Sequence, residues 1–287
     1  MAAIYKKELR SYFTSMMGYV FIAFFLVIIG IYFTVTNLLS GYANIEYTLN
    51  SISFLFVLLA PLLTMRLMAE ENKQKTDQLL FTSPLTAGSI VMGKYLAVLT
   101  VFGAAMLIVC FYPLILTQYG TVPLASGYSS ILGFTLLGGA YLALGLFISA
   151  LTDSQVVAAI ISFIVFLVTV LMDGIAGILP TDNASAVAIF TIVILIICII
   201  LYIGMHNLTI VTSIGLLCEA ALVLIYFLKP TILDGSVIGV CGWFSVITRF
   251  DNFTYGILDL SSILYYLSII FLFTFLTTQV IKKKRWS

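Results

Sequence analysis

Long apolar runs recur along this 287-residue sequence, and they constrain its fold more than any other feature. A helix needs about 20 mainly apolar residues to cross a bilayer. Hydrophobic residues make up 62% of the chain and charged residues 9%, against about 45–50% and about 25% in soluble domains. The sequence therefore predicts an all-α, polytopic membrane helix bundle that forms a single domain over residues 1–287. The apolar runs lie at 18–38, 51–68, 95–117, 129–151, 156–178, 187–205, 208–228 and 262–281.

The number of spans depends on residues 187–228. Little more than His206 and Asn207 separates the two apolar runs of this region. The region is either two spans joined by a tight turn or one long segment lying partly in the interface. We expect eight transmembrane helices, with six as the alternative, and both numbers leave the two termini on the same side of the membrane.

The distribution of basic residues predicts the orientation. If the N-terminus is cytoplasmic, all of the 13 Lys and Arg residues except Lys229 and Arg249 fall on the inner side. Cytoplasmic segments of membrane proteins carry an excess of Lys and Arg. We therefore expect both termini and the segment 69–94 in the cytoplasm, and the longer segment 229–261 outside.

The segment 4–17 precedes the first apolar run and is predicted to be an amphipathic helix. Its two faces differ in chemistry, because basic residues lie opposite aromatic and aliphatic ones. Such a helix lies in the headgroup plane with its apolar side toward the lipid. The apolar face consists of Tyr5, Leu9, Tyr12, Phe13 and Met16, and the basic face includes Lys6, Lys7 and Arg10.

The segment 69–94 is the most polar part of the chain, and it is predicted to form a helix, a break and a second helix. The sequence "TSP" before Leu85 indicates the break, because the residue before a proline is disfavoured in the α region. Thr86 or Ser89 can cap the second helix. Leu79 and Leu80 form an apolar patch between charged residues. They could either dock into a partner protein or dip into the lipid interface.

Enzymatic and metal-binding functions are disfavoured by the sequence. Residues 88–94 match most of a phosphate-binding loop, but Tyr95 stands where that motif needs Ser or Thr to hold Mg²⁺. The chain has one histidine, His206, which is too few for a zinc hydrolase. Its four cysteines show no CxxC spacing, and a net charge of +1 gives no indication of nucleic-acid binding. We expect no cofactor to be bound by this chain.

The pattern E-E-x4-T-D-Q-L-L-x3-P-L-T-x6-G-K, after an amphipathic lead-in and two spans, resembles the permease subunit of type-2 ABC exporters. Within these permeases it most resembles the branch named after gliding-motility permeases. Residues 249–268 are also similar to the region before the last span in that branch. The eight apolar runs depart from the six spans that are usual in such permeases. The matching positions are Glu70, Glu71, Thr76, Leu79, Leu80, Pro84, Gly93 and Lys94.

This resemblance implies a passive half of a two-component machine. In such exporters a separate soluble ATPase dimer holds the ATP and Mg²⁺, and it works with two identical or homologous permease halves. A cytoplasmic helix between the second and third spans docks into each ATPase. The resemblance also implies a bacterial cytoplasmic membrane. The residues that it assigns to ATPase coupling are Glu70, Glu71, Thr76, Leu79, Leu80, Pro84 and Lys94.

Glu219 is the one acid deep inside an apolar run, where an ionised group costs about 2.5–3.5 kcal/mol to insert. It is either part of a transport pathway or a protonated side chain bonded to a neighbouring helix. The first reading would suit a secondary, proton-linked transporter. A further alternative is a membrane anchor or sensor that recruits a cytoplasmic partner without transporting anything. The sequence does not identify a substrate.

Close contact between helices is predicted where glycines cluster. The stretch "LGGAYLALG" contains Gly138, Gly139 and Gly145. Small residues let helix backbones approach one another in membranes. We therefore expect this run to lie against another helix, either inside the bundle or at the contact between two permease halves.

Overall fold

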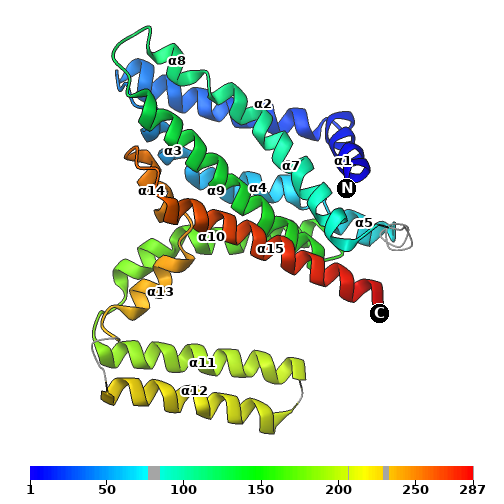
Figure 1. Cartoon of the computed structure of the whole chain (residues 1–287), viewed down its shortest axis with the longest axis vertical. Coiled ribbons are helices and arrows are strands. Elements are labelled where there is room, and N and C mark those ends of the chain that lie inside the picture. The colour runs from blue at the N-terminus through cyan, green and yellow to red at the C-terminus, as the bar shows by residue number, and fades with distance from the viewer. Residues whose placement is uncertain (77–84, 206, 229–232, 287) are drawn as a thin grey trace. The chain divides into compact units, whose positions relative to one another are not determined.

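The computed structural model describes residues 1–76, 85–205, 207–228 and 233–286, and within these residues it contains helices and no strands. Figure 1 shows their arrangement. The all-α prediction is confirmed. In chain order the helices are α1 (Ala2–Thr14), α2 (Met17–Phe33), the π-helix η1 (Thr34–Leu39), α3 (Ile45–Ile52), the 3-10 helix η2 (Ser53–Leu55), α4 (Phe56–Thr64), α5 (Ala69–Gln74), α7 (Ala87–Val109), α8 (Tyr112–Leu116), α9 (Leu124–Leu151), α10 (Gln155–Ile178), α11 (Asn183–Met205), α12 (Leu208–Leu228), α13 (Ser236–Phe244), α14 (Thr248–Thr254) and α15 (Leu260–Trp286).

Among the described residues, seven helical stretches are long and apolar enough to cross a membrane. The apolar part of α11 at Asn183–Ile199 is shorter. α11 and α12 are separate helices packed against each other, so the alternative of one long segment over residues 187–228 is wrong. The seven stretches are Met17–Leu39, Ile45–Gln74, Ala87–Leu116, Leu124–Leu151, Gln155–Ile178, Val211–Leu228 and Leu260–Arg285.

The chain divides into two compact units. The first comprises residues 1–170 and 246–287, and the second comprises residues 171–245. In the first unit α9 is the central helix, because α3, α4, α7, α14 and α15 all pack against it. In the second unit α11 packs against α12 and α13. Thus the candidate coupling segment belongs to the first unit and Glu219 to the second.

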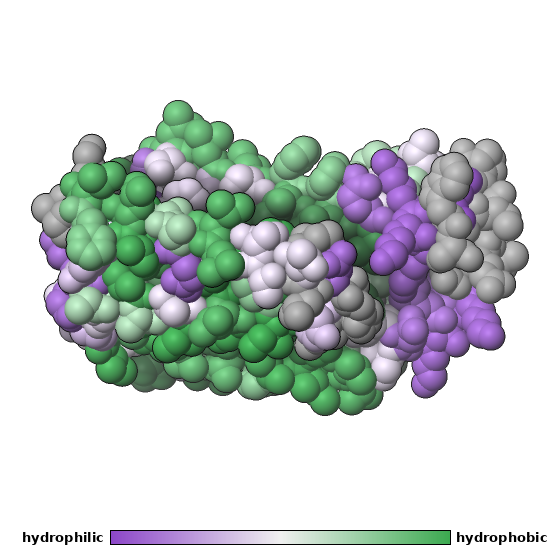
Figure 2. Space-filling view, turned by 90° about the horizontal axis from the view of Figure 1, so that it is seen from below, coloured by the Kyte–Doolittle hydropathy of each residue, from purple (hydrophilic) through white to green (hydrophobic). Residues whose placement is uncertain are grey.

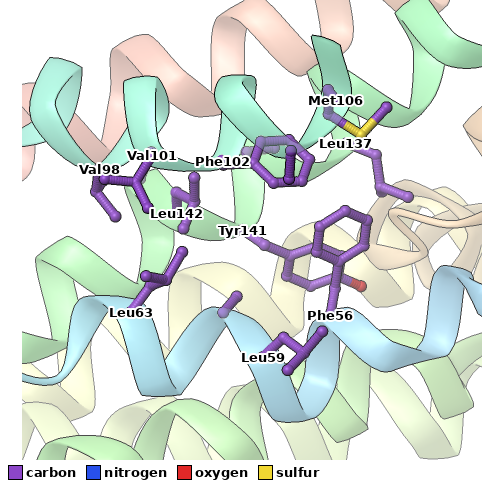
Figure 3. Packing of buried hydrophobic residues seen from close by; sticks show 14 of the residues in the cluster. Phe56, Leu59, Leu63, Val98, Val101, Phe102, Met106, Leu137, Tyr141 and Leu142 are labelled. Carbon is purple, nitrogen blue, oxygen red and sulfur yellow. The ribbon is translucent and has the colours of Figure 1, made fainter. Parts of the chain in front are cut away.

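The core of the first unit is built mainly from α4, α7 and α9. Figure 3 shows side chains from these three helices meeting in one layer. Phe56 lies at its centre, with its ring 4.7 Å from that of Phe134, 5.6 Å from Phe102 and 5.7 Å from Tyr141, centroid to centroid. Aromatic pairs at such distances stabilise a core beyond the area that they bury. This packing fixes the scaffold from which the polar end of the unit projects.

Two glycines allow the helices to approach closely. A Cβ atom on Gly145 of α9 would lie 2.9 Å from Cβ of Thr64, which confirms that the glycine run lies against another helix. A Cβ atom on Gly93 of α7 would lie 3.1 Å from Cβ of Ile4. The second contact matters for the site below, because it lets α1 lie directly on α7.

The amphipathic lead-in is a helix, as predicted, and one row of its residues is buried. Ile4, Glu8 and Tyr12 are spaced four residues apart and so share one face, while α1 packs mainly on α7. Tyr12 donates a hydrogen bond of 2.6 Å to the carbonyl of Leu63. Tyr12, predicted to face lipid, thus faces protein instead. The location of α1 in the headgroup plane stays a prediction.

Hydrophilic residues gather at one end of the first unit. Figure 2 shows them where α1, α5 and the C-terminus of α15 lie in Figure 1. This grouping is expected of a protein whose apolar surface meets lipid. The candidate site lies at this polar end.

Candidate functional site

The centre of the polar end is a lysine that is shielded from solvent. The side chain of Lys94, in the second turn of α7, is 1% exposed. Its ammonium nitrogen lies 3.0 Å from Oε1 of Glu8, 2.8 Å from Oε2 of Glu71 and 2.6 Å from the carbonyl oxygen of Leu67. Since an ammonium group has three N–H donors, every donor of Lys94 has an acceptor.

A second lysine completes the group of charges. Nζ of Lys7 lies 3.0 Å from Oε1 of Glu71 and 3.8 Å from Oε1 of Glu8. Lys7, Glu8, Glu71 and Lys94 form what we term the Lys94 cluster. Its two cations balance its two anions. This balance matters because a buried charge is tolerated only when an opposite charge is paired with it. The cluster joins three segments that are far apart in sequence: α1, α5 and α7.

The neighbouring carboxylates favour the charged form of Lys7, the more exposed cation of the cluster. Burial lowers the pKa of the Lys7 ammonium, but the hydrogen bond and charge of Glu71, together with Glu8, raise it by more. The net effect is a pKa above the ordinary lysine value of 10.5. Lys7 is therefore fully charged at neutral pH.

α5 is fastened to its surroundings at both ends. Oγ of Ser149 in α9 accepts hydrogen bonds of 3.1 Å from the backbone N–H groups of Met68 and Ala69, and it donates one of 3.1 Å to the carbonyl of Met65. These bonds satisfy backbone groups that the start of a helix leaves free. Farther along, the Asn72 amide donates to the carbonyl of Thr152 at 3.0 Å. Hydrogen bonds between side chains and the backbone thus tie α5 to α9, and ion pairs tie it to α1 and α7.

An outer ion pair borders the cluster. Nε of Arg66 lies 2.7 Å from Oε2 of Glu70, four residues later. These groups and the Lys94 cluster line a cavity of about 460 Å³ between α1, α5 and the start of α7. Its lining carries equal numbers of basic and acidic side chains. The residues around it are Lys7, Glu8, Ser11, Tyr12, Ser15, Arg66, Leu67, Glu70, Glu71, Gln74, Thr76 and Lys94.

The chemistry of this arrangement is electrostatic and not catalytic. Its carboxylates and ammonium groups are paired with one another, so none is poised as a general base or nucleophile. Among the described residues no group of three or more His, Cys, Asp or Glu side chains could hold a metal ion. What the arrangement can do is transmit displacement, because moving α5 strains ionic contacts to both α1 and α7.

The structure brings together four of the residues that the sequence assigns to coupling, namely Glu70, Glu71, Thr76 and Lys94. Two of them, Glu71 and Lys94, are paired with each other inside the protein. Leu79, Leu80 and Pro84, as well as the predicted helix break, lie outside the described residues. Thr86 caps α7, with its Oγ1 3.3 Å from the N–H of Ser89.

Sequence reasoning missed Glu8 and the role of Lys7. Glu8 lies in a basic segment and is easily taken for a solvated residue. The available signal was its spacing, because Ile4, Glu8 and Tyr12 recur every fourth residue and a helix places them in one row. An acid in an otherwise apolar row needs a partner cation, and Lys94 is that partner.

Glu219 lies apart, in α12 of the second unit. The hydroxyl of Thr191 in α11 donates to its Oε2 at 3.1 Å, and its Oε1 is buried with no hydrogen-bond partner among the residues that the structure describes. This contact matches the reading in which Glu219 bonds to a neighbouring helix. A role of Glu219 in a transport pathway stays a prediction.

One comparison with known proteins bears on this arrangement. A family model described as ABC-2 family transporter protein matches residues 4–211. The matched range covers well over half of the chain and includes all four members of the Lys94 cluster. No curated protein matches the chain.

Proposed function

The chain belongs to the ABC-2 transporter family and is a membrane permease component, and from this premise we propose that it is one half of an ATP-driven exporter coupled to a separate ATPase through the segment 69–94. The branch of gliding-motility permeases remains the assignment suggested by the sequence motif. The permease itself is not the catalytic component. ATP and Mg²⁺ bind to the ATPase subunits, of which we expect two copies.

The Lys94 cluster is the observation that carries this proposal. α5 leads directly into residues 77–84, where the sequence places the Leu79-Leu80 patch that we assign to ATPase docking. Glu71 in α5 contacts Lys94 at 2.8 Å and Lys7 at 3.0 Å. A displacement of the docking segment is therefore transmitted through short ionic contacts to α1 and to α7, which is a candidate span. Such contacts resist displacement more than apolar packing does, because separating paired buried charges is costly.

The remaining parts of the proposal follow from the family and the sequence. Two permease halves, identical or homologous, assemble in a bacterial cytoplasmic membrane with their termini and the segment 69–94 on the inner side. Export is favoured over import because, among the described residues, the segments at the opposite end are short loops and short helices such as α8 and α14. These segments form no folded domain of the size that would capture a substrate outside the cell.

The test is to purify the chain with a candidate ABC ATPase from the same genome and to measure complex formation and ATP hydrolysis. Replacing Leu79 and Leu80 together by Asp should abolish co-purification, because two charges would have to enter an apolar interface. The matched control is Leu258→Asp, since Leu258 is an exposed leucine in the loop between α14 and α15. The control should retain the complex.

If the double variant inserts into the membrane normally yet binds and stimulates the ATPase as the unchanged chain does, the docking assignment is wrong. If both variants lose the complex, the effect is not specific to the segment 77–84. An intact complex that hydrolyses ATP without any effect of the permease would favour an anchor over a transporter.

A further inference from the structure

Glu46, at the end of the first unit away from the Lys94 cluster, is a buried acid without a partner. It lies in the first turn of α3 and is 4% exposed. Neither of its carboxylate oxygens has a hydrogen-bond partner among the described residues. Burying a charged group without compensation is among the most costly features of a protein. The residue therefore calls for a binding partner that the chain itself does not supply.

A cavity of about 360 Å³ lies beside this carboxylate. Its walls come from α3 and the residue before it, from the start of α9 and from the end of α14, three elements that pack on one another. In Figure 1 these elements meet at the opposite end of the unit from α1 and α5. The lining residues are Asn44, Glu46, Tyr47, Asn50, Ser126, Thr254 and Tyr255.

Three other polar side chains of the lining are engaged elsewhere. Asn50 donates to Asp251 at 3.2 Å, and the hydroxyls of Ser126 and Thr254 donate to backbone carbonyls at 2.9 and 2.7 Å. The nearest basic residue of α14, Arg249, lies over the ring of Tyr265, 5.4 Å from its centroid. Glu46 is thus the one charged residue of the lining, and the cavity carries a net charge of −1.

We propose that this cavity binds a ligand through an organic ammonium group, with Glu46 as its counter-ion. A neutral hydroxyl could satisfy one carboxylate oxygen, but it would leave the charge uncompensated, whereas an ammonium group supplies both hydrogen bonds and charge. The residues Tyr47 and Tyr255 are 60% and 78% exposed, and aromatic faces attract ammonium groups. An anionic ligand would be repelled.

The carboxylate oxygens are themselves shielded, so binding requires the Glu46 side chain to turn toward the ligand. An ammonium group can reach this end of a membrane protein from two sources, namely the headgroup of a phosphatidylethanolamine lipid or a free amine. This inference rests on the cavity and is independent of ATPase coupling.

The experiment measures binding to the purified full-length chain in detergent. Three probes are titrated: short-chain phosphatidylethanolamine, short-chain phosphatidylglycerol and ethanolamine. Binding is followed as the shift in the midpoint of thermal unfolding. The variant Glu46→Gln keeps the shape and removes the charge, and Tyr47→Ala removes a ring at the rim. The control Asp234→Asn removes an exposed acid of the second unit.

We expect phosphatidylethanolamine to bind and phosphatidylglycerol not to bind at the same concentrations. Glu46→Gln should weaken binding roughly 30-fold, as truncating one partner of a buried charge pair does, and Tyr47→Ala should weaken it less. A response to ethanolamine as strong as that to the lipid would identify free amines as the source. Glu46→Gln should fold, since it removes an unpaired charge.

Several results would overturn the inference. One is an equal response to phosphatidylglycerol, and another is unchanged binding by Glu46→Gln. The absence of any response to the two amine-bearing probes would also overturn it. An equal loss of binding in Asp234→Asn would show that overall charge, and not this cavity, controls binding.

Discussion

Replacing Lys94 by Met removes the cation at the centre of the cluster and leaves a side chain of similar length. Glu8 and Glu71 then lose the buried cation between them. Their side chains are only 12% and 14% exposed, so water does not replace it freely. Removing one partner of a buried ion pair costs about 3–5 kcal/mol, because the other charge stays buried and uncompensated. Lys7 remains 3.0 Å from Glu71 and 3.8 Å from Glu8. We therefore expect the low end of this range, about 3 kcal/mol.

The effect can be measured as the midpoint of thermal unfolding of the purified chain in detergent. A change of 1 kcal/mol moves the midpoint by roughly 2–4 °C in domains of 150–250 residues, so Lys94→Met should lower it by roughly 6–12 °C. The matched control is Lys73→Met, since Lys73 is an exposed lysine of α5. The control should change the stability by less than about 0.5 kcal/mol.

The reasoning is refuted if Lys94→Met unfolds at the same temperature as Lys73→Met. That result would mean that the two glutamates find water or other partners when the lysine is lost. A drop much larger than predicted would instead mean that the detachment of α1 exposes the apolar side of α7.

Three further outcomes follow from other contacts of the first unit. Ser149→Ala should destabilise the chain by about 1–3 kcal/mol, because two backbone N–H groups at the start of α5 lose their acceptor; hydrogen exchange should report the opening of α5. Gly145→Ala should destabilise the chain by about 1–3 kcal/mol, because the new methyl group would meet Thr64. Its control, Gly103→Ala, should be neutral or stabilising, because there is open space around Gly103. The midpoints of thermal unfolding of the two variants are compared. The folded-state pKa of Lys7 is raised above 10.5, so its contribution to stability is complete below pH 10.5 and is lost as the pH rises through the folded-state pKa. The difference in stability between the unchanged chain and Lys7→Met should therefore become smaller in that alkaline range. A difference that stays constant with pH would contradict this prediction.

The helical architecture could be predicted because most of the apolar runs are about as long as a membrane-spanning helix. The run near 95–117 lies in α7 and α8, and the run near 129–151 lies in α9. Thr86, one of the two predicted caps, is the residue that caps α7. The region 187–228 was ambiguous for a physical reason. Hydropathy is equally high in one long helix and in two helices, and only the packing of α11 on α12 distinguishes them.

The candidate site was predictable only in part, because its contacts join distant segments. The motif around Glu71 and Lys94 singled out both residues, but it gave no reason to expect them 2.8 Å apart in the protein interior. Their meeting depends on α1 lying against α7, which brings in Glu8, 86 positions from Lys94. Glu46 was overlooked for a similar reason. It falls between the first two apolar runs of the sequence, and its burial arises only where α3 meets α9 and α14.

A paired replacement distinguishes the structural role of the Lys94 cluster from the coupling role that we propose for it. Changing Lys94 to Met and Glu71 to Gln together removes one charge of each sign and leaves Glu8 beside Lys7. Because the two sites contact each other, the effects should not add, and the double variant should be more stable than Lys94→Met alone. The ionic connection between α5 and α7 is nevertheless absent from it. If this connection transmits motion from the ATPase, transport coupled to ATP hydrolysis stays impaired although stability returns. If coupling returns together with stability, the cluster serves the fold alone, and the transmission proposed for it is wrong.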